Sequence, residues 1–186
     1  MRLLTPILLL CALFGCQTPV EEPPQSVEPQ SVENAALGIS LAEIAAGFEL
    51  VTNEGSRLEL EPTETEGRIW FELGPVTEGG VNLVEIVNSQ KEQFLALPDG
   101  TFSGNRELLM TDGRSAYYSR GQFSDAGEAV EELRISALHP TQNRLLRVLY
   151  RYPQADDSSD RLTDLLLIVG EIEPYELTPE SPEAIE

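Results

Sequence analysis

The chain has 186 residues and carries 32 acidic against 12 basic side chains, which gives a formal net charge of −20 at neutral pH. Such an acidic surface repels nucleic acid and anionic lipid headgroups, so we expect no nucleic-acid partner. Both cysteines, Cys11 and Cys16, lie near the N-terminus, and this leaves the rest of the chain without a thiol for a disulfide, a thiolate metal site or a cysteine nucleophile.

The first segment has the layout of an export signal. Arg2 supplies a positive charge, an apolar run covers residues 7–14, and the run ends in Leu13-Phe14-Gly15-Cys16. The run is shorter than the roughly 20 apolar residues that a bilayer-spanning helix needs. Its last four residues resemble the lipobox of bacterial lipoproteins, which directs a peptidase to cut before the cysteine. Leu13, Gly15 and Cys16 match that pattern, whereas Phe14 is larger than the usual residue.

The resemblance covers only residues 1–16, and it implies that residues 1–15 are a signal peptide and that Cys16 carries the lipid anchor. Acyl chains contribute about 0.8 kcal/mol per buried CH₂, so two or more chains hold a protein on a membrane. Gln17 follows the cysteine, where lipoproteins retained in the inner membrane often carry Asp, so the resemblance implies the outer membrane, facing the periplasm. The alternative is an ordinary signal peptide in which Cys16 is incidental.

Residues 16–37 have the composition of a disordered tether. Pro, Glu, Gln, Ser and Val dominate without apolar periodicity, so the segment buries too little surface to offset the entropy of ordering. It contains a tandem copy, with Pro24–Glu28 followed by Pro29–Glu33. We interpret this duplication as a variation in spacer length.

Residues 38–172 form the predicted globular domain. Ser40–Ala46 is predicted to be a short helix that Gly47 ends. Short apolar stretches then recur between turn sequences such as Asp112-Gly113 and His139-Pro140, and the pairs on either side of these two turns look like antiparallel hairpins. The stretches are Phe48–Val51, Leu58–Leu60, Arg68–Leu73, Val81–Val87, Leu108–Met110, Ser115–Phe123, Ala129–Leu138 and Arg144–Tyr152.

Two more helices are predicted. Asn88–Leu97 has a capping Asn88 and an apolar side. The second helix begins at Ser159 or Asp160 and ends at Gly170, with apolar residues at i, i+3, i+4 and i+7, namely Leu162, Leu165, Leu166 and Val169. Residues 173–186 are expected to be an acidic flexible tail.

Strands followed by a packing helix predict an α+β fold, mainly an antiparallel sheet packed with a C-terminal helix and one or two shorter helices. The element order resembles the PsbP-like fold on three features: Val81–Glu85 before a helix, Asp112–Tyr118 at the start of a hairpin strand, and the closing Leu162–Val169 helix. No functional residue is carried over from this resemblance.

Few residues point to chemistry. His139 is the only histidine and precedes Pro140 in a turn, so a structural role is favoured over catalysis. Asp156, Asp157, Asp160 and Asp164 could bind Ca²⁺, but acids at a helix N-terminus already have a reason to be there, so we expect no metal and no cofactor. Trp70 is expected to lie under a helix, with an exposed contact to a sugar or peptide as the alternative.

One stretch departs from the acidic average, because residues 133–155 contain no Asp or Glu. If the chain turns at Pro140–Asn143, residues whose numbers sum to 283 face each other, and Leu133, Ile135 and Ala137 share an apolar face with Tyr150, Val148 and Leu146. Acids elsewhere in the fold could neutralise the arginines of the opposite face. The functional alternative is a mixed apolar and basic partner contact made by Arg134, Arg147, Leu138, Leu145 and Leu149.

The leading interpretation is an envelope lipoprotein, anchored through Cys16, whose globular domain acts as a non-enzymatic binding or scaffolding module for an envelope protein. Two alternatives stay open: a periplasmic hydrolase that uses carboxylates, and a carrier of a lipophilic ligand. A cleft with converging acids would favour the hydrolase, and a deep apolar cavity would favour the carrier.

Overall fold

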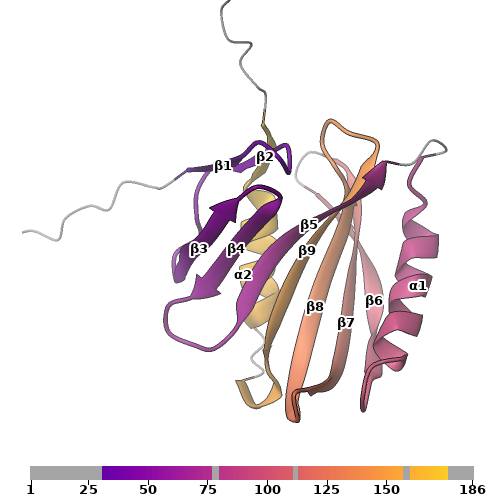
Figure 1. The fold of residues 1–186 in the computed structure, drawn as a ribbon. Coiled ribbons are helices and arrows are strands. Elements are labelled where there is room, and N and C mark those ends of the chain that lie inside the picture. Colours follow the sequence, from indigo (N-terminus) through magenta and orange to yellow (C-terminus); the bar gives the residue numbers. More distant parts are fainter. Residues whose placement is uncertain (1–30, 77–79, 111–112, 157–159, 176–186) are drawn as a thin grey trace, which may run out of the picture.

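A computed structural model describes residues 31–76, 80–110, 113–156 and 160–175, and the segments that it does not describe are drawn in grey in Figure 1. Cys16 and the predicted export signal lie outside these residues. Within them, no helix is both long and apolar enough to cross a membrane.

Most strands form one seven-stranded antiparallel sheet in the order β3-β4-β5-β9-β8-β7-β6. A second, three-stranded sheet has the order β1-β2-β10. The bounds are β1 Val32–Asn34, β2 Ile39–Leu41, β3 Phe48–Glu54, β4 Arg57–Pro62, β5 Arg68–Val76, β6 Thr101–Leu109, β7 Ser115–Asp125, β8 Glu128–Leu138, β9 Arg144–Pro153 and β10 Ile172–Pro174.

Two α-helices cover opposite faces of the large sheet, with α1 (Leu83–Leu95) beside β6–β8 and α2 (Asp160–Gly170) on the far side (Figure 1). A 3₁₀ turn, η1 (Gln154–Asp156), precedes α2. The predicted α+β class, with a mainly antiparallel sheet and a C-terminal helix, is therefore confirmed.

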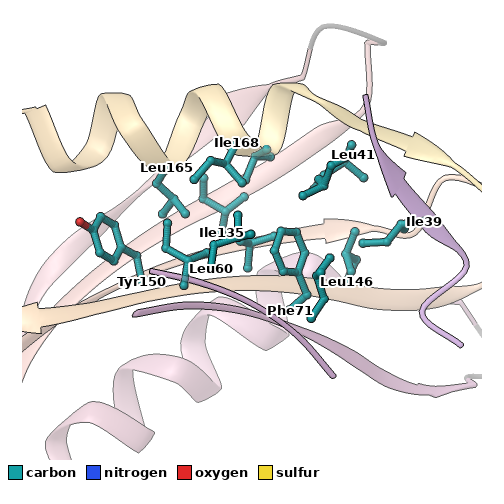
Figure 2. Packing of buried hydrophobic residues seen from close by; sticks show 14 of the residues in the cluster. Ile39, Leu41, Leu60, Phe71, Ile135, Leu146, Tyr150, Leu165 and Ile168 are labelled. Carbon is teal, nitrogen blue, oxygen red and sulfur yellow. The ribbon is translucent and has the colours of Figure 1, made fainter. Parts of the chain in front are cut away.

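The main core lies between the large sheet and α2. Its strand residues alternate along the chain, as a sheet with one buried face requires, and Leu165 and Ile168 of α2 pack against them (Figure 2). The predicted β8–β9 register is confirmed, because Leu133 pairs with Tyr150 and Ile135 with Val148. At this interface α2 buries Leu165, Ile168 and Val169, whereas Leu166, predicted to face the core, is exposed.

A smaller cluster docks α1 on the other face of the sheet. Phe94 is fully buried against Phe123 and Val130. Gly121 makes this approach possible, since a Cβ there would lie 2.4 Å from the Phe94 ring. One turn earlier, Gln90 accepts a hydrogen bond from the Ser119 hydroxyl at 2.9 Å and donates one to Ser136 Oγ at 2.7 Å.

The structure corrects the predicted start of α1. The helix begins at Leu83, five residues before Asn88, because the side chain of the preceding Asn82 accepts hydrogen bonds from the backbone N–H groups of Val84 and Glu85. The stretch Val81–Val87 is therefore not a strand. Its apolar residues also fit the helical period, with Val87 and Phe94 buried on the side that faces the sheet.

The prediction of a helix over Ser40–Ala46 is wrong. Ile39–Leu41 forms β2, which lies between β1 and β10, and both Ile39 and Leu41 are buried. The alternation in a three-residue strand is too short to be distinguished from a helical turn. One partner of β2, β1, lies only a few residues earlier in the sequence, whereas the other, β10, lies near the other end of the chain.

The folded part also extends beyond residues 38–172 at both ends. Strand β1 falls within the segment predicted to be a tether, and it consists of the last two residues of the second repeat copy, Val32 and Glu33, followed by Asn34. Asn34 fixes it there, since its Oδ1 accepts a hydrogen bond from the Leu37 N–H and its Nδ2 donates one to Asn53 Oδ1, both at 2.8 Å. At the other end, β10 reaches Pro174.

Candidate partner-binding face

The helix α1 packs on β6, β7 and β8, and no helix among the described residues covers the neighbouring strands on the same face (Figure 1). The side chains of β4, β5 and β9 that point to this side include Glu59, Trp70, Glu72, Arg147 and Arg151, which the registers of these strands place next to one another. We call this region the open sheet face.

Ion pairs occupy much of the open sheet face. Arg147 Nη2 lies 2.7 Å from Glu72 Oε2, and Trp70 Nε1 donates to Glu72 Oε1 at 3.1 Å. The Arg151 guanidinium lies between two rings, 5.3 Å from the centroid of Trp70 and 4.9 Å from that of Phe123. Trp70 is thus half-buried beside an arginine on the open face, and not under a helix as expected.

Arg134, a predicted contact residue, is covered by α1. Its Nε donates to Glu132 Oε1 at 2.5 Å, its Nη1 donates to Gln93 Oε1 at 3.0 Å, and its Cζ lies 4.0 Å from the centroid of the Phe94 ring. Arg134 is 8% exposed. A helix-borne amide and a same-strand carboxylate satisfy this arginine, so replacing it with Glu would place an acid beside the buried Glu132 instead of testing a surface.

The five predicted contact residues are therefore not brought together on one surface. Leu149 is buried, with 5% of its surface exposed, and Leu138 is half-buried near the β8–β9 turn. Arg147 and Leu145 do share a surface, because both line a groove beside α1. Sequence reasoning could not separate these two from the others, because α1 covers Arg134 from a distant part of the chain.

The groove has a volume of about 480 Å³ and runs between the first half of α1 and strands β5 and β9. We call it the α1 groove. At Gly74, where a Cβ would lie 3.2 Å from Leu145 Cβ, the absence of a side chain contributes to the hollow. Its wall combines apolar and polar groups, among them Val81, Ile86, Ser89, Leu145 and Arg147. The groove was missed from the sequence because it depends on the early start of α1 at Leu83.

A second hollow of about 470 Å³ lies at the other end of the open sheet face. Trp70 and Arg151 line it together with Arg68, Glu66 and Tyr152. It carries arginines and glutamates side by side, so it has no strong excess of either charge.

His139 serves to join two turns. It is 3% exposed, and its Nε2–H donates to the Leu37 carbonyl at 2.8 Å. Its Nδ1 accepts hydrogen bonds from the backbone N–H groups of Thr141 and Gln142, both at 3.2 Å, which assigns the neutral tautomer. Burial lowers the pKa of His139, and the positive charges of Arg114 and Arg144 act in the same direction, whereas the hydrogen bond to Leu37 opposes them.

We expect the domain to lose stability as the pH falls below about 6.5, the ordinary pKa of histidine. Below that pH, His139 binds a proton in the unfolded chain, whereas in the folded domain its lowered pKa delays protonation to a lower pH. The free energy of unfolding therefore decreases as the pH falls, and it levels off below the pKa of the folded domain. Urea denaturation at pH 7.5, 6.5 and 5.5 measures the slope. Because His139 is the only histidine, His139→Gln should flatten it, and an unchanged slope in that variant would refute the assignment.

The aspartates that the sequence offered as Ca²⁺ ligands lie before and within α2, and the structure describes only some of their side chains. Asp157 lies outside the described residues, and the Asp156 side chain is not described. Asp164 is half-buried, and burial raises its pKa while the nearby Arg161 opposes this shift. Within the described ranges, no group of three or more His, Cys, Asp or Glu side chains is gathered in a way that could hold a metal ion.

Arg161 packs in the main core at the start of α2. It is 5% exposed, and its Nη1 donates to Thr65 Oγ1 at 2.7 Å and to the Tyr150 hydroxyl. The rings of Tyr150 and Tyr152 also lie within 5.5 Å and 5.2 Å of its Cζ. These contacts give the residue a structural role in holding α2 against β9.

No protein-family model matches the chain, and no characterised protein matches its sequence. Solved structures match it in fold. LpqN of Mycobacterium tuberculosis, described as involved in cell envelope biogenesis, is 16% identical with a TM-score of 0.56, and the match covers 81% of this chain and 88% of LpqN. The Ran-binding protein Mog1p of Saccharomyces cerevisiae is 12% identical with a TM-score of 0.52, covering 80% and 96%.

A protein from Bacteroides thetaiotaomicron also matches, with 9% identity and a TM-score of 0.54, although the match covers 49% of that protein. At these identities the likeness shows the fold alone. The chain shares the fold of LpqN and Mog1p, and the PsbP-like fold that the element order resembled is represented among its structural neighbours.

Proposed function

We propose that the chain is a lipid-anchored lipoprotein of the bacterial envelope and that its globular domain binds an envelope protein through the α1 groove, without catalysing a reaction. The lipobox-like Leu13-Phe14-Gly15-Cys16 supports the anchor. The fold likeness to LpqN, an envelope biogenesis protein, and to Mog1p, a Ran-binding protein, supports a binding role. Gln17 favours the outer membrane, with the domain facing the periplasm.

The observation that carries the binding site is the composition of the α1 groove. Apolar side chains from two elements, Ile86 of α1 and Leu145 of β9, face a space into which a partner side chain could insert. Arg147 lies at the same wall with its charge held by Glu72. Protein interfaces favour such arginine and apolar contacts, with polar groups at the rim.

The test introduces the photoreactive residue benzoylphenylalanine into the full chain, which is expressed in a bacterium so that it is exported to the envelope. At Ser89, which is exposed and lines the groove, we expect an adduct with one envelope protein, identified by mass spectrometry and by reciprocal capture. Glu92 is exposed on α1 but does not line the groove, so the same probe there should give no such adduct. The same adducts from both positions would contradict a site in the groove.

Membrane attachment through Cys16 is tested in the same strain by separating soluble and membrane fractions. Cys16→Ser should release the domain into the soluble fraction, whereas the control Cys11→Ser should leave it with the outer membrane. Membrane sedimentation of the Cys16→Ser chain would contradict lipid anchoring at this residue.

A further inference from the structure

The second hollow of the open sheet face lies where β5 begins and β9 ends. Arg68 and Trp70 of β5 line it together with Arg151 of β9, and the strand register places Arg68 opposite Arg151. Gly67 lets the turn before β5 lie close to β9, since a Cβ there would be 2.9 Å from Tyr150 Cε2 and 3.1 Å from the Arg151 carbonyl oxygen. Among the described residues, none lines both this hollow and the α1 groove, so the two are separate sites.

The arginines and the buried carboxylate that line the second hollow already have partners of opposite charge. Glu59 is 7% exposed, and it accepts a hydrogen bond from Arg57 Nε at 2.7 Å and lies 3.9 Å from Arg68 Nη1. Arg68 Nη2 also lies 2.9 Å from Glu61 Oε1, and Arg151 is held by one carboxylate of β7 and one of β8. These ion pairs balance the charges and hold the polar groups in place.

Trp70, the only tryptophan of the chain, gives the hollow a flat carbon surface. Its ring is half-buried and fixed, because Nε1–H donates to Glu72 Oε1 at 3.1 Å and the Arg151 guanidinium lies 5.3 Å from the ring centroid. Since the indole N–H is already bonded, the rest of the ring offers only carbon atoms to a ligand. The hollow therefore combines an aromatic surface with guanidinium donors and carboxylate acceptors.

This combination favours one class of ligand. An ion would have to compete with the existing ion pairs, and the net charge of −20 further disfavours an anion. Glu66 also lines the hollow, but it is exposed, so water screens its charge. A purely apolar ligand would cover Arg68 and Glu59 without replacing their hydrogen bonds to water. A neutral ring with hydroxyl groups fits, because its C–H face packs on the indole and each hydroxyl both donates and accepts.

We propose that the second hollow binds a neutral saccharide of an envelope glycan. Trp70 supplies the packing surface, Arg68 donates hydrogen bonds to the sugar hydroxyls, and Glu59 accepts them. The volume of about 470 Å³ lies within the range of about 300–1,000 Å³ that is usual for small-molecule sites. The envelope source of the glycan rests on the proposed function, whereas the site itself does not depend on the α1 groove.

The test titrates the full chain, purified in lauryldimethylamine oxide, a detergent without a sugar headgroup, with chitotetraose or cellotetraose. Because Trp70 is the only tryptophan, its fluorescence reports on this hollow alone. We expect the emission to shift to shorter wavelength as the saccharide replaces water at the ring, with a dissociation constant of about 1 mM or tighter. Binding of either saccharide supports the proposal, and a preference for chitotetraose identifies an N-acetylated glycan as the source. The anionic tetragalacturonate should not bind.

Two arginines that share one carboxylate provide a matched pair of variants. Arg68→Gln should weaken saccharide binding about tenfold, as the loss of one charge-assisted hydrogen bond implies. Arg57→Gln should leave the affinity unchanged, because Arg57 also pairs with Glu59 but does not line the hollow. Both side chains are at least half exposed, so neither change should prevent folding. An unchanged emission with both neutral saccharides, equal affinity in Arg68→Gln and the unaltered chain, or equally tight binding of tetragalacturonate would overturn the proposal.

Discussion

Glu132→Ala is expected to lower the free energy of unfolding by about 3–5 kcal/mol, the usual cost of breaking a buried ion pair by removing one partner. Glu132 is fully buried in β8, an interior strand of the large sheet. Its Oε1 accepts a hydrogen bond from Arg134 Nε, and its Oε2 accepts two from Arg151, at 3.0 Å and 2.8 Å. Alanine would leave Arg134 buried under α1 without a carboxylate.

Urea denaturation of the variant and of a control on the same strand measures this effect. Glu128 is exposed at the start of β8, so Glu128→Ala should change the free energy of unfolding by less than about 0.5 kcal/mol. Arg151 retains Asp125 at 2.7 Å in Glu132→Ala, so the loss falls mainly on Arg134. A change below about 1 kcal/mol in Glu132→Ala would mean that water or Gln93 replaces the carboxylate.

Phe94→Ala is expected to cost about 3–5 kcal/mol and to loosen α1 specifically. The ring is fully buried and fills the centre of the smaller cluster, with Phe102 and Phe123 at centroid distances of 6.1 Å and 6.4 Å and with the Arg134 guanidinium over its face. The rest of the α1 interface combines the buried Val87 with hydrogen bonds from Gln90 and Gln93. Hydrogen exchange should therefore rise along α1 more than along β8 and β9.

Two variants test whether the effect belongs to this contact. Leu95 is the exposed neighbour, so Leu95→Ala should leave both stability and exchange nearly unchanged. Gly121→Ala should cost about 1–3 kcal/mol by overpacking against the Phe94 ring. In the Phe94→Ala background that cost should largely vanish, because the ring is gone. Additive costs in the double variant would show that the two residues do not interact.

Alternation and turn chemistry were enough to predict the β8–β9 hairpin. A period of two fixes the buried set, and a turn at Pro140–Asn143 fixes the register, so Leu133 and Tyr150 pair as expected. The helix Asp160–Gly170 was predictable for the same kind of reason, since its apolar residues recur at a helical period. In both cases the signal is contained in residues that are close in the sequence.

The same local reasoning failed where the deciding partner is distant. Ser40 carries a helix-capping signal, yet β2 forms because β10 joins its free edge from the other end of the chain. Asn88 and Asn82 are both acceptable caps by sequence, and the helix starts at the earlier one.

For the candidate site, the sequence by itself determined that Arg134, Arg147 and three leucines point to the same side of one hairpin, because a strand alternates its side chains whatever surrounds it. Only the tertiary structure decided which of them a partner can reach. The helix α1 comes from more than 30 residues earlier in the chain, and where it docks depends on Gly121, Phe94 and the Gln90 hydrogen bonds. Its position buries Arg134 and opens the groove at Leu145 and Arg147, a division that no local periodicity encodes.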